Sequence, residues 1–270
     1  MTFLAALLAW LVSLSVTARR LPGIDSMHSI LAGLVRRLGG STVALLLIVL
    51  LPAVLVWLLL WWAQLWWLTP VLGFVVLVLA FGPGDQADQL QAYRALQDEG
   101  DFDGAYQLAV STMGMSEGLY ERGPSQMDQA LKQGLAYQLF QHFFVSLFWY
   151  VAFGVPGVIM SSSLSLVQPI FRGEPGGPLA LQLSHAVNWI PVRLLTLSLA
   201  LVGNFAQGFA IWVRRLREFE YVDRALLASA VRSSLPGEPH EQKPEDLLLL
   251  IKRAQVLWLV VLAVFTIFSW

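Results

Sequence analysis

The sequence of 270 residues contains no cysteine, which excludes disulfide bonds, thiolate metal ligands and cysteine nucleophiles. Charge is also scarce, because Asp, Glu, Lys and Arg make up 13% of the chain, against about 25% in typical soluble domains. Apolar side chains are abundant instead and account for 57% of the residues. The composition therefore predicts an integral membrane protein with the lipid bilayer as its main partner.

Motifs for common chemistries are missing as well. The net charge of −1 and the lack of a basic, aromatic-interleaved patch argue against nucleic acid binding. The four histidines are far apart, and the sequence has neither a P-loop nor a serine-hydrolase elbow. The segment from Asp98 to Gly104 resembles a calcium loop, but Val110 stands where an EF-hand needs a carboxylate. We expect no catalytic residue, no metal and no cofactor from these motifs.

The first long hydrophobic run lies between Arg37 and Asp85. A single helix over it would be about twice as long as the hydrocarbon core of a bilayer is thick. We therefore expect a hairpin with arms at about 43–61 and 67–81. Tryptophans crowd its turn, where indole rings favour the membrane interface: Trp57, Trp61, Trp62, Trp66 and Trp67.

Three further runs predict one span each, which makes five clear transmembrane helices. The run 133–171 predicts a span with an irregular exit at Ser161–Ser163, and the runs 175–213 and 254–270 predict the other two. A sixth span is expected at residues 2–17, although Val16–Ala18 could also be a signal-peptidase site. The basic pair Arg19–Arg20 follows the apolar stretch rather than preceding it, which favours a retained helix.

Orientation is predicted from the basic residues. With an outside N-terminus, the inside loops are residues 19–41, 83–134 and 214–253, and these hold fifteen of the seventeen Lys and Arg residues. The positive-inside rule then predicts a multi-pass protein of a bacterial inner membrane, with these loops in the cytoplasm.

The fold class is therefore an all-α polytopic membrane bundle with two helical cytoplasmic loops. In the acidic loop, residues 83–134, apolar residues at helical spacing predict one helix, and a second is expected from about Asp103 to Ser111. The other loop is expected to continue the membrane helix through Phe219–Tyr221, to break at Pro236–Pro239 and to resume after Pro244. The expected parts are 1–82, 83–134, 135–213, 214–253 and 254–270.

One formal charge lies within a predicted span, in the sequence Asn188-Trp-Ile-Pro-Val-Arg193. A guanidinium there is costly unless it pairs, faces water or reaches the interface. One interpretation is a snorkelling Arg193 with Pro191 in the first helical turn. The other is a polar pocket in which Arg193 binds an anion and Asn188 orients it. The pocket candidates are Asn188, Trp189, Pro191 and Arg193, followed by His185, Asn204 and Gln138.

This element is part of a family resemblance. Together with Leu147-Phe148-Trp149, Gly154-x-Pro156-Gly157 and the 90–109 loop, it resembles the AmpE-like branch of the AmpE/CobD (CbiB) membrane family, over roughly residues 90 to 205. The CobD/CbiB branch makes adenosylcobinamide phosphate with ATP, which requires groups that hold Mg²⁺ and phosphates. The positions where that branch is expected to carry acidic and polar groups are occupied here by Tyr137, Gln138, Gln141, Gln168, Ser184 and His185.

The missing carboxylates favour the AmpE-like branch, which implies an inner-membrane signalling modulator associated with cell-wall recycling and β-lactamase induction. A cytoplasmic partner, such as the amidase encoded with such proteins, would meet the inside loops. Two alternatives stay open. One is a cobalamin-assembly enzyme with its acidic ligands moved to Glu117, Glu121 or Asp128. The other is a small-molecule transporter, although no inverted repeat is detected.

Overall fold

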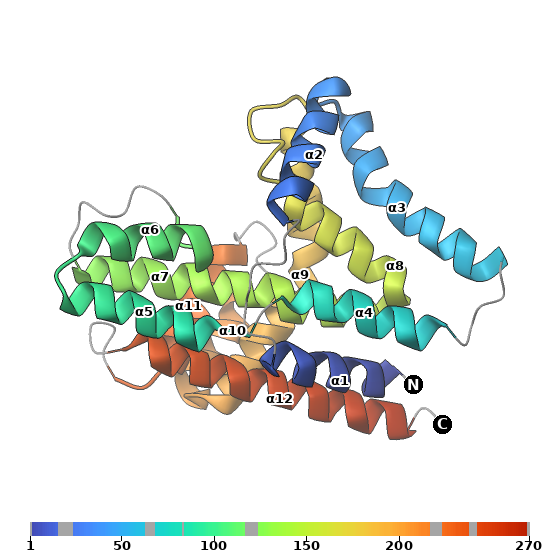
Figure 1. Ribbon diagram of the computed structural model, residues 1–270. Helices are drawn as coiled ribbons and strands as arrows, with labels where there is room; N and C mark the ends of the chain where they lie inside the picture. Colours follow the sequence, from blue (N-terminus) through green and yellow to red (C-terminus); the bar gives the residue numbers. More distant parts are fainter. Residues whose placement is uncertain are drawn as a thin grey trace. The chain divides into compact units, whose positions relative to one another are not determined.

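The computed structural model describes residues 2–15, 24–62, 68–82, 84–116, 124–216, 223–237 and 242–268. These residues form helices and no strand (Figure 1). Five helical stretches are long and apolar enough to cross a membrane, which confirms the predicted fold class. They are Thr42–Trp62, Thr69–Asp98, Gln126–Val167, Gly177–Val202 and Pro244–Phe268.

The chain divides into two compact units. Unit 1 comprises Met1–Pro83, Gln141–Ile190 and Thr266–Trp270, and unit 2 comprises Gly84–Phe140 and Pro191–Phe265. The stretches Thr69–Asp98 and Gln126–Val167 are longer than a bilayer requires, and their charged ends lie outside the uncharged runs of the sequence. These charged ends belong to unit 2.

Unit 1 contains the predicted membrane hairpin. Its arms are α3 (Thr42–Trp62) and α4 (Thr69–Phe81), close to the expected bounds, while Trp66 and Trp67 lie outside the described residues. The 21 residues of α3 span about 31 Å at 1.5 Å per residue, which suits the hydrocarbon core. The other helices of unit 1 are α1 (Thr2–Ser15), α2 (Ile24–Arg37) and α8 (Ser146–Val167).

Helix α8 is the centre of packing in unit 1. Helices α2, α3 and α4 contact it, and α1 packs on α4. The core includes Leu45, Val49, Leu164 and Phe171, all at most 2% exposed. Helix α4 approaches α8 closely because Gly73 has no side chain, and a Cβ at that position would collide with the Tyr150 hydroxyl.

The structure corrects the predicted exit at Ser161–Ser163. Helix α8 continues through these serines to Val167, since a helical serine can bond back to a preceding carbonyl, as Ser161 Oγ does to Val158 O at 3.1 Å. The irregularity lies earlier, at Gly154, whose φ of 66° breaks the helical path two residues before Pro156.

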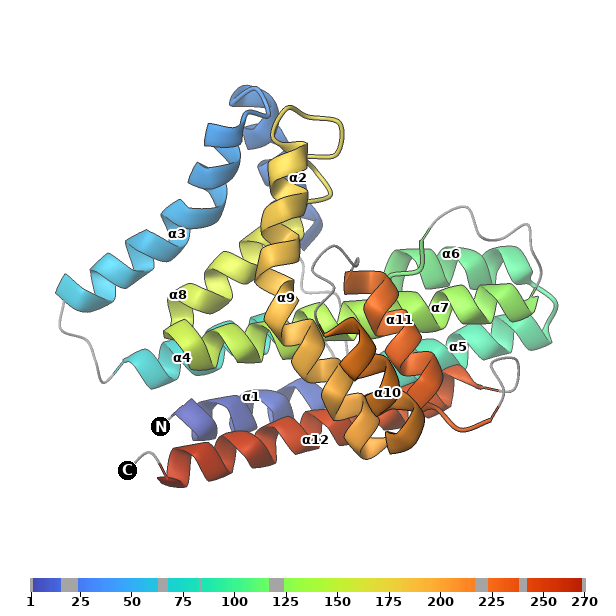
Figure 2. The same cartoon turned by 180° about the vertical axis from the view of Figure 1, so that it is seen from behind.

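Unit 2 contains the charged helices. Its first part comprises α5 (Gln86–Asp98), α6 (Phe102–Thr112) and α7 (Pro124–Leu139), which lie side by side in both views (Figure 2). The predicted helix pair of the acidic loop is thereby confirmed. Between α5 and α6, the Asp101 carboxylate caps α6 by accepting from Gly104 N at 2.9 Å, which is a role in the turn. A π-helical segment, η2 (Phe140–Val145), connects α7 to α8.

The rest of unit 2 comprises α10 (Phe205–Arg215), α11 (Asp223–Ser234), most of α12 (Pro244–Phe268) and the second half of α9 (Gly177–Val202). The break before Pro244 is confirmed. The prediction of one unbroken helix over 175–213 is wrong, because α9 ends at Val202 and α10 begins at Phe205, while the expected continuation through Phe219–Tyr221 stays a prediction. Residues 217–222 themselves lie outside the described residues. The chain turns at Gly203, where a Cβ would meet Ser234 O and Leu199 O, and Asn204 caps α10.

Candidate functional site

Helix α9 carries the polar element predicted from the sequence. Asn188 and Arg193 are 2% and 4% exposed, and His185, Trp189 and Pro191 lie on the same helix. Pro191 is in the middle of this 26-residue helix, so the interpretation that placed it in the first turn is wrong. The reason is that α9 begins at Gly177, well before the polar element.

A proline at this position leaves a carbonyl without its usual helical donor. Pro191 has no N–H, so it cannot bond to Val187 O four residues earlier. The Trp149 indole occupies that acceptor instead, with Nε1 donating to Val187 O at 3.2 Å. The Leu-Phe-Trp motif on α8 thus contacts the residue just before the Asn-Trp-Ile-Pro-Val-Arg motif on α9, and this contact compensates for the proline.

Arg193 joins α9 to the far end of α10, opposite the turn at Gly203. Its Nε donates to Leu216 O at 3.3 Å, and its own carbonyl accepts from Trp212 Nε1 at 2.9 Å. At the other end of this hairpin, a Cβ at Gly208 would contact Ala200, so the two helices approach closely. Asp223, which begins α11 and is 6% exposed, attracts Arg193 electrostatically. The described contacts of Arg193 therefore connect three helices of unit 2, and an anion-binding role for it stays a prediction.

The other pocket candidates lie elsewhere in the fold. Asn204 accepts from Gln207 N at 3.4 Å and lines a hollow of about 360 Å³. Gln138 on α7 donates to Thr112 O at 3.1 Å. Neither Gln138 nor any pocket candidate on α9 lines the hollow at Asn204, so these residues do not form one described pocket.

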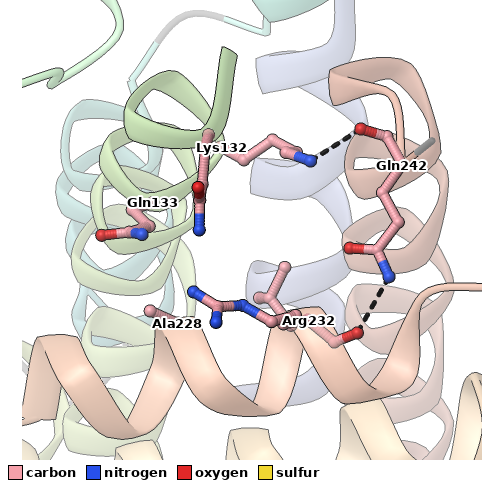
Figure 3. A pocket seen from close by; sticks show the side chains of 7 residues that line it. Lys132, Gln133, Ala228, Arg232 and Gln242 are labelled. Atoms are coloured by element: carbon pink, nitrogen blue, oxygen red, sulfur yellow. Dashed lines mark hydrogen bonds between the residues drawn. The ribbon is translucent and has the colours of Figure 1, made fainter. Parts of the chain in front are cut away.

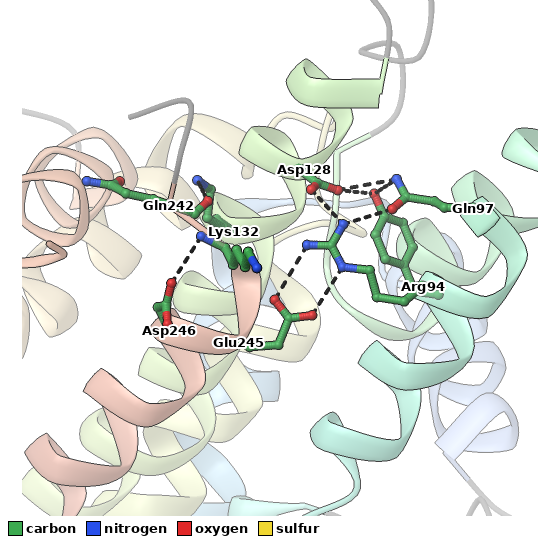
Figure 4. Close-up of polar contacts among 9 residues, drawn as sticks. Arg94, Gln97, Asp128, Lys132, Gln242, Glu245 and Asp246 are labelled. Carbon is green, nitrogen blue, oxygen red and sulfur yellow. Dashed lines mark hydrogen bonds and ion pairs between the residues drawn. The ribbon is translucent and has the colours of Figure 1, made fainter. Parts of the chain in front are cut away.

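Unit 2 also contains a polar centre that the sequence did not predict. Arg94 on α5 donates to Asp128 on α7 at 2.8 Å and to Glu245 on α12 at 3.1 Å (Figure 4). The Tyr93 hydroxyl donates to the same Asp128 carboxylate at 2.8 Å, and Gln97 contacts both residues. We call these five residues the Arg94 joint. It links three helices, since Asp128 and Glu245 lie 34 and 151 residues after Arg94 in the chain.

Electrostatics stabilise the Arg94 joint. Partial burial alone would raise the pKa of Glu245, but the hydrogen bonds and charge of Arg94 outweigh it and hold that pKa below its ordinary value. Burial and the Asp128 carboxylate raise the pKa of Tyr93, so its hydroxyl remains a protonated donor. No sequence spacing could reveal this joint, since its members come from three distant segments.

The carboxylates proposed for a relocated metal site do not form one in the described residues. Asp128 is bound by Tyr93 and Arg94, while Glu117 and Glu121 lie outside the described ranges. Within those ranges, no group of three or more His, Asp or Glu residues is placed to hold a metal ion.

Comparisons with known proteins agree with the resemblance seen in the sequence. The family described as "Regulatory signalling modulator protein AmpE" matches residues 24–270, a longer stretch than the motifs alone covered. A relative from Shigella flexneri, named "Protein AmpE", is 25% identical over 153 residues, which is 52% of this chain and 53% of the relative. The match thus spans about half the length of that relative. No solved structure matches the chain.

Proposed function

The chain belongs to the AmpE family of regulatory signalling modulators, and from this membership we propose that it acts at the bacterial inner membrane in cell-wall recycling and β-lactamase induction. It is a multi-pass membrane protein with five helices long and apolar enough to span. The orientation predicted by the basic residues places the charged helices of unit 2 in the cytoplasm. There they could contact a soluble component of the recycling machinery, such as an amidase.

The observation that carries the proposal is the Arg94 joint. Long loops without internal structure would have to be ordered on binding, at an entropic cost. Here α5, α7 and α12 are held together before any partner arrives, because one guanidinium bonds to carboxylates from two other helices. A preorganised surface of this kind suits a protein that transmits a signal by contact.

The exposed turn between α5 and α6 is acidic. Asp98, Glu99 and Asp103 are all exposed at the turn between α5 and α6. None of the three has a role in the Arg94 joint, and the neighbouring Asp101 serves as a helix cap. Opposite charges steer association and fix register, so we propose that the partner presents a basic surface to this acidic turn.

The experiment is in-cell crosslinking of the full chain, combined with a β-lactamase induction assay in a strain that lacks the native gene. A variant carrying Asp98→Asn, Glu99→Gln and Asp103→Asn should recover several-fold less crosslinked partner and should alter induction. Glu174→Gln in unit 1 is the matched control and should behave like the unchanged chain. Identical crosslinked partners and identical induction in the triple variant would refute the proposal.

A further inference from the structure

A second opening in unit 2 lies between α7 and α11, close to the start of α12. Figure 3 shows Lys132 and Gln133 from α7 on one side, Arg232 and Ala228 from α11 on another, and Gln242 on the third. We call it the Lys132 pocket. The residues that line it are Gln129, Lys132, Gln133, Ala228, Val231, Arg232 and Gln242.

The pocket is rich in hydrogen-bond donors and poor in negative charge. Lys132 is 7% exposed and donates to the backbone carbonyl of Gln242 at 2.6 Å. An ammonium has three donors, so this neutral acceptor uses only part of its capacity. The Gln242 side chain is occupied elsewhere, since its Nε2 donates to Arg232 O at 3.0 Å and to Gly237 O at 3.2 Å, which closes the end of α11.

Two nearby carboxylates do not fully balance the charge of Lys132. Asp128 and Asp246 both attract Lys132, but Arg94 already binds Asp128 at 2.8 Å, Asp246 accepts from Lys243 N at 3.3 Å, and both Arg94 and Arg232 repel Lys132. None of the described lining residues is acidic. Burial lowers the pKa of Lys132, as expected for an ammonium with too little compensating charge. Two cations thus meet at one opening, an arrangement that an anion would stabilise.

We propose that the Lys132 pocket binds an oxyanion of the phosphate class, with Lys132 at its floor and the exposed Arg232 at its rim. A lysine acts on phosphate as a point charge, while the arginine fork can hold two oxygens. The free volume of about 20 Å³ holds a water-sized group, so the pocket takes one end of the ligand. That end is one oxygen of a phosphate group, which belongs either to free phosphate or to the headgroup of an anionic lipid, and the two share the same chemistry.

The test is titration of the full chain, purified in detergent, with inorganic phosphate, using potassium chloride at equal ionic strength as the control. Binding is followed by calorimetry and by the midpoint of thermal unfolding. Arg232→Gln should weaken binding about tenfold or more, because a charged hydrogen-bond donor is lost. Lys132→Gln should abolish saturation. Lys252→Gln, which removes an exposed cation outside the pocket, should bind like the unchanged chain.

Nanodiscs separate the two sources of phosphate. If the headgroup is the ligand, discs containing phosphatidic acid compete with free phosphate, whereas phosphatidylcholine discs do not. If free phosphate is the ligand, both discs leave its binding unchanged, and either result supports the pocket.

Three results would overturn the proposal. They are an absence of saturable binding, equal affinity in the Arg232→Gln variant, and binding that is detected only after Glu238→Gln or Glu241→Gln. The last would mean that a carboxylate of the chain itself serves as the anion. Because Arg232 is exposed, its variant remains informative even if Lys132→Gln fails to fold.

Discussion

The α9 element and the Arg94 joint each depend on an arginine, and the two arginines are held in opposite ways. Arg193 is 4% exposed and bonds to a backbone carbonyl, with the buried Asp223 as its electrostatic partner. The Arg94 side chain is 29% exposed and bonds to two carboxylates that water also reaches. When Arg94 is substituted, water can hydrate much of the charge of its partner carboxylates. When Arg193 is substituted, little water reaches the groups that it leaves behind. Burial, rather than the number of ion pairs, should therefore decide which arginine matters more for stability.

The largest effect is expected for Arg193→Leu. The substitution removes the bond to Leu216 O and the cation that attracts Asp223, so it should cost about 3 kcal/mol of unfolding free energy. The unfolding free energy of Arg193→Lys should lie between those of this variant and the unchanged chain, because lysine keeps the charge without the guanidinium geometry. Denaturant unfolding in detergent, followed by tryptophan fluorescence, measures both. A fully stable Arg193→Leu variant would remove the distinction between the two regions.

The next effect concerns Trp149→Phe, which leaves Val187 O without the indole donor and should cost about 1.5 kcal/mol. The matched variant is Pro191→Ala, which supplies the missing N–H to the same carbonyl. In the Pro191→Ala background the same tryptophan substitution should cost clearly less. Equal costs in both backgrounds, measured by the same unfolding experiment, would show that the indole does not compensate for the proline.

A smaller effect, about 1 kcal/mol, is expected for Arg94→Gln, because its ion pairs are partly exposed. Amide hydrogen exchange of α5 measures this loss of stability, and faster exchange is expected in the variant. Lys252→Gln, which removes a cation outside the joint, should leave that exchange unchanged. If Arg94→Gln lost more unfolding free energy than Arg193→Leu, the exposed arginine would matter more for stability than the buried one, contrary to expectation.

The smallest effect is a pH dependence of the Arg94–Glu245 pair. The pKa of Glu245 is lower in the folded chain than its ordinary value of 4.5, so the pair stabilises the fold at neutral pH. This contribution is lost as the pH falls through the folded pKa, below about 4.5. At pH 7 the unfolding free energy of the unchanged chain should exceed that of Glu245→Gln by about 0.5 kcal/mol. At pH 4 this difference should be smaller. A constant difference would argue against an ionised pair.

Hydrophobic runs and helical spacing predicted two pairs of helices that are adjacent in the chain. The hairpin of α3 and α4 follows from one uncharged run, and the pair α5 and α6 follows from helical spacing and the Asp101 turn. The fold-back at Gly203 was missed because apolar residues continue past it, and hydropathy does not register a turn. The extent of α9 was misjudged for a similar reason, since a proline is tolerated in mid-helix once Trp149 bonds to Val187 O.

The candidate site was predictable only in part. The single charge within an apolar run drew attention to Arg193, which is 4% exposed, but its partners Leu216 and Asp223 come from later segments of the chain. The same is true of Lys132, whose acceptor lies 110 residues further on. Tertiary contacts of this kind have no signature in the spacing of a single sequence.

Site-specific photocrosslinking in living cells tests whether the charged helices of unit 2 bind the partner and the α9–α10 hairpin does not. A photoreactive residue would replace exposed Gln91 on α5 in one chain and exposed Val213 on α10 in another. We expect one soluble protein to be crosslinked from position 91 and none from position 213. Recovery of the same protein from both positions, or of no protein from position 91, would refute this assignment.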